Sequence, residues 1–155
     1  MNNLFYVTAD ISSKLAGVRT DILNIAFKSN FFDVVLCNHV LEHVIDDRKA
    51  MRELHRILKP GGWAILQSPM DFSRKEPFED FNVVLPQDRE RLFGQSDHVR
   101  IYGLDYKERL LNAGFSVKID GFLQNLKPSK AQRYGLPIYE DIYFCRKEGL
   151  PSFKL

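Results

Sequence analysis

The alternation of apolar and polar positions is most informative over residues 31–66. Residues 32–37 form an apolar run too short for an independent helix, which is typical of a strand covered on both faces in a parallel sheet. From Asp47 onward the apolar positions recur at three- and four-residue spacing, which predicts a helix that ends before Pro60. Residues 63–66 form a second apolar run. The pattern therefore predicts a β-α-β unit with a right-handed crossover.

Shorter patterns predict the rest of the fold. We expect strands at residues 4–9, 18–20, 115–120 and 141–145, helices at 87–93 and from a capping box at 105–108 up to Gly114, and an irregular loop at 126–140. The last strand is expected to run antiparallel to the strand before it. The fold class is therefore α/β, with a doubly wound, mostly parallel sheet and an antiparallel C-terminal strand.

The long polar interval after the central unit suggests a functional insertion. A connection of this length in a small domain is usually a functional loop or a disordered segment. We predict that residues 70–104 form a lid or substrate insertion within a single domain spanning residues 1–155, a length that allows one buried core.

Composition narrows the function classes. A net charge of +2, with 27% charged residues, gives no charged pole for nucleic acid or an anionic membrane, and we expect neither as a partner. No window approaches the roughly 18 apolar residues of a membrane span, and the N-terminus lacks a signal-peptide pattern. Cys37 and Cys145 fall in predicted buried strands and are expected to be core thiols of a cytoplasmic protein, with a disulfide between them as the less favoured alternative.

Polar side chains follow three of the predicted strands. Asp10 and Asp21 end two successive strands, and residues 38–43 follow the third. Ligands of parallel α/β sheets bind beyond the carboxyl ends of the strands, so these residues are candidates for a binding site. Asp10 and Asp21 taken singly are equally typical of turns.

Histidines supply the candidate catalytic groups. His43 and His98 are candidate general bases because imidazole titrates near neutral pH, although each alone could be a structural histidine. Residues 39–43 also match the zinc-protease motif H-x-x-E-H, which requires a continuous helix. Because this stretch bridges a strand and a helix, no metal site is predicted, and Glu42 is interpreted as a turn carboxylate rather than a metal contact.

The two strand-ending acids, together with FFDVVLCNHVLEH and ELHRILKPGGWAIL, resemble the class I S-adenosylmethionine-dependent methyltransferases, specifically the type 11 group. The resemblance covers residues 4–70 and implies a Rossmann-like sheet. It also implies methyl transfer from S-adenosylmethionine to a small-molecule or metabolite acceptor.

The resemblance assigns cofactor contacts by position. Asp10, with Ile11 beside it, would hold the ribose hydroxyls, because a carboxylate can accept hydrogen bonds from both. Asp21, with Ile22, would bind the adenine amino group. Asn38 and His39 would line the methionine end of the cofactor.

The sequence departs from that family at its N-terminal side. A first strand and a glycine-rich turn normally precede the acid that corresponds to Asp10, and only nine residues precede it here, none of them glycine. The first strand is therefore expected to be missing from the sheet. A homodimer or a partner chain could complete the sheet, and the alternative function is a non-catalytic fragment or partner subunit that cannot bind cofactor alone.

Overall fold

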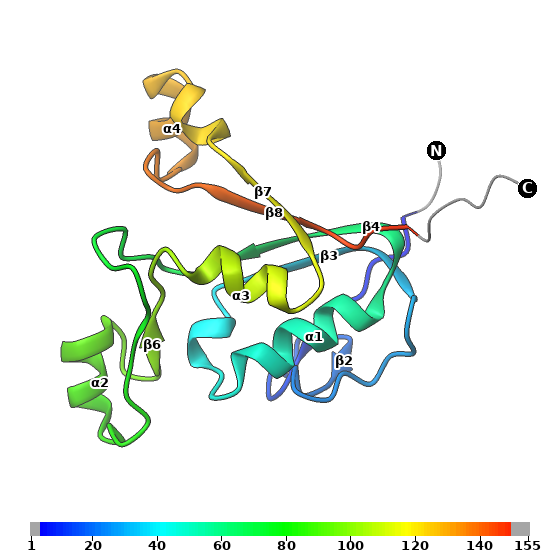
Figure 1. The fold of residues 1–155 in the computed structure, drawn as a ribbon, viewed down its shortest axis with the longest axis horizontal. Coiled ribbons are helices and arrows are strands. Elements are labelled where there is room, and N and C mark those ends of the chain that lie inside the picture. The colour runs from blue at the N-terminus through cyan, green and yellow to red at the C-terminus, as the bar shows by residue number, and fades with distance from the viewer. Residues whose placement is uncertain (1–3, 150–155) are drawn as a thin grey trace, which may run out of the picture.

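The computed structural model describes residues 4–149, so the outermost residues of the predicted domain, 1–3 and 150–155, lie outside the described part (Figure 1). Its centre is a four-stranded sheet in the order β3-β4-β8-β7. Strand β3 (Phe32–Asn38) runs parallel to β4 (Leu58–Gln67). Strand β8 (Ile142–Arg146) lies antiparallel between β4 and β7 (Ser116–Asp120). The α/β class with an antiparallel C-terminal strand is confirmed.

Two helices lie side by side against this sheet, below it in Figure 1. Helix α1 (Asp47–Ile57) begins where the Asp46 carboxylate accepts a hydrogen bond from the Lys49 N–H at 2.9 Å, which satisfies a free donor of the first turn. Helix α3 (Tyr106–Asn112) packs beside it. The apolar stripes of both helices are buried against the sheet and form the core, with Ala50, Met51, Leu54, Ile57, Tyr106 and Leu110 as members.

The remaining elements are short. They are β1 (Ala9–Asp10), β2 (Val18–Arg19), the 3₁₀ helix η1 (Leu41–His43), β5 (Phe78–Glu79), α2 (Pro86–Phe93), β6 (Arg100–Ile101), the 3₁₀ helix η2 (Phe122–Asn125) and α4 (Pro128–Tyr134). Strands β1 and β2 form a parallel pair of their own, and β5 pairs antiparallel with β6. Helix α2 and strand β6 form a lobe beside α1 and α3 (Figure 1). Both thiols, Cys37 and Cys145, are buried and free, so the disulfide alternative was wrong.

Three local predictions were wrong. The strand predicted at 4–9 is reduced to Ala9–Asp10. The apolar side chains of residues 4–6 are exposed, so no core packing holds this segment in a longer strand. The loop predicted at 126–140 contains α4, since Pro128 occupies a first helical position and Gly135 adopts a left-handed C-cap, so both residues bound a helix. Asp105 does not cap α3; its carboxylate accepts from Arg109 Nε at 2.9 Å instead.

Strand β3 is covered on one face only, which corrects the prediction of a strand buried on both. Cys37 points into the core, whereas the side chains of Val34 and Leu36 are 39% and 61% exposed. Within residues 4–149, β3 also pairs with β4 alone, and β1 and β2 are not hydrogen-bonded to it. One edge of β3 therefore carries unpaired backbone groups.

Candidate functional site

The site is organised by the turn that follows β3. At its start, His39 adopts a left-handed backbone conformation with φ 55° and donates its backbone N–H to the Gln67 carbonyl at 2.8 Å. This conformation is costly for a side chain other than glycine, and such strain concentrates at functional sites. The turn takes the chain out of the sheet and into η1, with Leu41 and Glu42 pointing inward.

Glu42 is fully buried, contrary to its interpretation as an ordinary turn carboxylate. Its Oε2 accepts a hydrogen bond from Ser68 Oγ at 2.9 Å, while its Oε1 lies 3.5 Å from His39 Nδ1. Burial and the nearby charge of Glu42 together raise the pKa of the Cys37 thiol to about 12. Glu42 therefore places a buried carboxyl group at the carboxyl end of the parallel strands.

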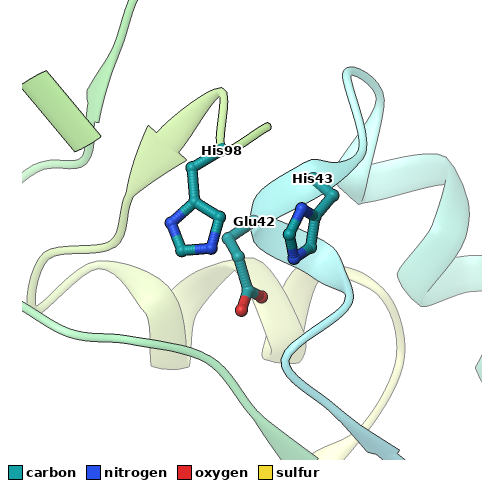
Figure 2. A group of neighbouring side chains, drawn as sticks. All are labelled: Glu42, His43 and His98. Atoms are coloured by element: carbon teal, nitrogen blue, oxygen red, sulfur yellow. The ribbon is translucent and has the colours of Figure 1, made fainter. Parts of the chain in front are cut away.

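The structure brings the two predicted catalytic histidines together. Their rings meet nearly perpendicularly with centroids 4.6 Å apart, and both face Glu42 (Figure 2). His43 Nδ1 lies 3.3 Å from Asp97 Oδ2, and His98 Nδ1 lies 3.1 Å from the Phe93 carbonyl oxygen. The side-chain hydrogen bond from Gln95 and the neighbouring His43 lower the pKa of Asp97, although slight burial opposes them. The sequence predicts each histidine but not their pairing.

A buried arginine connects the 70–104 insertion to this turn. Arg100, 1% exposed, donates hydrogen bonds to the carbonyls of Leu41 at 2.9 Å and Ile45 at 2.8 Å, and to that of Val44. The Val99 N–H donates to the Glu42 carbonyl at 2.9 Å. These bonds place His98 against His43. The sequence places Arg100 and Tyr102 after Asp97 and His98 in a patch predicted to face the acceptor, but it does not indicate the distant carbonyls that Arg100 binds.

The two strand-ending acids lie at one end of the small β1–β2 pair. Asp10 Oδ1 accepts the backbone N–H groups of Ser12 and Ser13, both at 2.7 Å, and these bonds lower its pKa. Asp21 Oδ1 accepts the Leu23 N–H at 2.8 Å. The turn role that the sequence offered as the alternative for Asp10 and Asp21 is therefore present, but the turn contacts occupy only one oxygen of each carboxylate.

The other predicted cofactor residues differ in exposure. Ile11 is exposed, and Ile22 packs against the core. Asn38 and His39 are exposed at the carboxyl end of β3. The structure therefore places the predicted residues in two groups, one at the end of the β1–β2 pair and one at the end of β3.

A cleft of about 170 Å³ opens at the carboxyl end of β4. Ser68, one of its lining residues, donates a hydrogen bond to Glu42, so the cleft adjoins the Glu42 carboxyl group. Its lining mixes apolar and polar groups: Gln67, Ser68, Pro69, Met70, Phe72, Glu140, Asp141 and Tyr143. Whole ligand sites usually measure about 300–1,000 Å³, so this cleft has the size for one ring or group.

Comparison with known proteins agrees with this arrangement. Residues 6–66 match the family described as "Methyltransferase domain". These residues carry the pattern of the methyltransferase-domain family. The matched segment, residues 6–66, thus includes Asp10, Asp21, β3, α1 and all of β4 except its last residue, Gln67.

Two relatives match parts of this chain. A 2-phytyl-1,4-naphtoquinone methyltransferase from Nostoc punctiforme is 40% identical over 60 residues, which are 39% of this chain and 25% of that protein. A demethylmenaquinone methyltransferase from Staphylococcus epidermidis is 42% identical over 48 residues, 31% of this chain and 20% of that protein. The matched stretch thus spans a quarter or less of each relative.

The fold extends the likeness beyond the matched segment. The S-adenosylmethionine-dependent methyltransferase from Mesorhizobium loti superimposes with a TM-score of 0.57 over 84% of this chain and 68% of that one, at 14% sequence identity. At this identity the likeness shows the fold alone. The S-adenosylmethionine-dependent methyltransferase fold predicted from the sequence is confirmed.

The donor set fits the cofactor that this family implies. Asp10 and Asp21 each keep one carboxylate oxygen free of hydrogen bonds within residues 4–149, and an ionised carboxylate oxygen accepts from hydroxyl and amino donors. Asn38 and His39 add exposed polar groups at the end of β3. Acceptor groups of this kind can bind the hydroxyl, amino and ammonium donors that S-adenosylmethionine carries.

Proposed function

We propose that this chain binds S-adenosylmethionine and takes part in methyl transfer to a small-molecule acceptor. The observation that carries the proposal is the match of residues 6–66 to the methyltransferase domain, over the same residues that hold both acids and the turn after β3. Asp10, with Ile11, would hold the ribose, and Asp21, with Ile22, the adenine. Asn38 and His39 would line the methionine end. The non-catalytic alternative is not favoured, because the matched residues keep both acids and the turn after β3.

Methyl transfer mainly requires that the acceptor and the cofactor be positioned relative to each other. The bound cofactor supplies an activated methyl group on a sulfonium, and an in-line displacement then needs the acceptor held at the right distance and angle. The cleft beside Ser68 is the proposed place for the acceptor's reacting ring, since it opens at the same strand ends. The names of the two relatives favour a quinone-type aromatic acceptor.

The 70–104 insertion is proposed to form the acceptor side of the site. It delivers His98 to His43, the pair predicted to be catalytic, and Arg100 holds it against the turn that carries Glu42. Each histidine has Nδ1 engaged, so the other ring nitrogen is the one able to face an acceptor.

Within residues 4–149, no helix combines the length and apolar composition needed to cross a bilayer. We place the protein in the cytoplasm, as its two free thiols suggest.

We also propose that a second copy of this chain covers the open edge of β3. Exposed strand edges are usually covered or blunted in native proteins, and this one bears the exposed apolar side chains of Val34 and Leu36.

Calorimetric titration with S-adenosylhomocysteine tests the cofactor proposal. We expect micromolar binding to the full chain and a loss of about 100-fold or more in Asp10→Ala, because two hydrogen bonds to a charged group contribute roughly 1.5–3 kcal/mol each. Asp10→Asn keeps an acceptor for Ser12 and Ser13 and is expected to weaken binding by a smaller factor.

Asp33→Ala is the matched control. Asp33 is an exposed acid of β3 that pairs with Lys59 at 2.8 Å, away from the predicted cofactor positions, so its removal should leave the affinity unchanged. Unchanged affinity in Asp10→Ala would remove Asp10 from the site. Absence of binding by the folded wild-type chain would overturn the proposal itself.

A further inference from the structure

Three side chains converge behind the turn that follows β3. Glu42, His43 and His98 each offer one potential ligand atom, and these atoms lie within 4.8 Å of one another. Glu42 and His43 come from η1, whereas His98 comes from the insertion just before β6 (Figure 2). The two imidazole rings flank the carboxylate.

Glu42 holds an unsatisfied buried oxygen. Its side chain is 1% exposed; Ser68 donates to Oε2, but Oε1 has no hydrogen-bond donor in the described chain. A buried carboxylate needs hydrogen bonds or a compensating charge, and each unsatisfied group in a native structure calls for a reason. Its nearest cationic candidate is His39, whose ring is more than half exposed. A cation bound at Oε1 would satisfy this oxygen.

The two histidines are oriented as metal ligands usually are. The Phe93 carbonyl only accepts, so it favours the tautomer in which His98 Nδ1 carries the proton, and the Asp97 carboxylate 3.3 Å from His43 Nδ1 favours the same tautomer there. This leaves Nε2 of each ring with its lone pair. Metal-binding histidines nearly always donate their other N–H to a carbonyl or carboxylate, which fixes the tautomer.

We propose that Glu42, His43 and His98 bind one divalent transition-metal ion, with Zn²⁺ as the best match to two imidazoles and a carboxylate. The same ligand set, with a fourth position open, serves catalytic zinc. Tetrahedral bonds of about 2.0–2.1 Å bring neighbouring ligand atoms to about 3.4 Å, so the widest separation in the cluster has to shorten by up to about 1.4 Å on binding. His43 has the room for this shift because its side chain is 28% exposed.

This site is not the H-x-x-E-H site of the sequence motif. In that motif His39 and His43 bind the metal and Glu42 acts as the base, all on one continuous helix. Here His39 lies outside η1 in a left-handed conformation, so His98 takes its place and Glu42 becomes a ligand. A metal in this position would lower the pKa of a hydroxyl group bound at its open position. Metal binding itself does not depend on the proposed methyl transfer.

Titration of the full, chelator-treated chain with Co²⁺ and with Zn²⁺ tests the proposal without cofactor or acceptor. We expect one ion per chain with micromolar or tighter affinity, and visible Co²⁺ absorption bands that Zn²⁺ abolishes. Glu42→Gln and His98→Gln should each weaken binding by at least 100-fold. Asp97→Asn, which alters only the partner of His43, should weaken it by about 10-fold.

His55→Gln is the control for general histidine binding. His55 lies on α1, outside the cluster, and its ring packs against Phe115, so its replacement should leave the affinity unchanged. The proposal is overturned if the folded wild-type chain binds neither ion, or if Glu42→Gln and His98→Gln bind as wild type does. Should circular dichroism show that these two variants do not fold, His43→Gln, at the more exposed ring, decides: unchanged affinity there contradicts the site.

Discussion

Asp47→Ala is expected to lower the free energy of unfolding by about 3–5 kcal/mol, because it removes the most buried acid of an ion-pair cluster and leaves its two buried arginines short of negative charge. Asp47 Oδ2 accepts hydrogen bonds from Arg109 Nη1 at 2.7 Å and from the Tyr102 hydroxyl at 2.8 Å, and Arg100 Nε lies 3.9 Å away. All four side chains are buried. Urea unfolding followed by circular dichroism measures the loss.

Glu79, the second acid of this cluster, does not compensate for the loss of Asp47. Glu79 of β5 accepts from Arg100 at 2.9 Å and from Arg109 at 3.2 Å, and despite partial burial these bonds lower its pKa. Burial disfavours the charge on Arg109, yet its bonds to Asp105 and Asp47 raise its pKa. Without Asp47, Arg100 keeps Glu79 and Arg109 keeps Glu79 and Asp105, both more exposed acids, and the bonds that join Tyr102 and Arg109 to α1 are lost.

Asp88→Ala provides the matched control. Asp88 pairs with Arg91 at 3.2 Å on the exposed face of α2, and an exposed pair contributes about 0–1 kcal/mol. If Asp47→Ala fails to fold at any urea concentration, Tyr102→Phe removes a single hydrogen bond to Asp47 and should cost about 1–3 kcal/mol. A loss below about 1 kcal/mol in both variants would show that the cluster does not hold the insertion in place.

The sequence was sufficient where local periodicity carries the structure. The change from an apolar run to three- and four-residue spacing at Asp47 predicted β3, α1 and β4, because each buries a face that the pattern marks. It failed where long-range packing decides. The Asp47–Arg109 pair joins residues 62 positions apart, and nothing near either residue indicates the other.

The candidate site shows the same division. His43 and His98 were predicted singly from side-chain chemistry, but their contact depends on Arg100 reaching the carbonyls of the η1 turn. Glu42 was interpreted as a turn carboxylate because a sequence does not reveal burial at a strand-to-helix transition. Its position between two histidines after a strand was the one available signal.

Unfolding of the wild-type chain is expected to depend on protein concentration. Coupled dissociation and unfolding of a dimer of 155-residue chains should raise the melting temperature by about 2 °C for each tenfold increase in concentration. The physical reason is the open edge of β3. Its seven residues leave backbone groups unpaired on one side within the described chain, and Leu36 and Val34 remain exposed beside them.

Leu36→Lys distinguishes pairing of two chains at β3 from the stability of the monomer. Leu36 is already 61% exposed, so lysine should leave the monomer nearly as stable while its charge opposes pairing, and the concentration dependence should disappear. Ile119→Lys is the matched control, because Ile119 is 40% exposed on β7, the other edge strand of the same sheet. Loss of the dependence in Ile119→Lys alone would move the contact to β7. A strand pairing between two chains that contributes to stability must respond to mass action. If the wild-type melting temperature stays constant over a hundredfold range of concentration, β3 therefore keeps its open edge in a stable monomer.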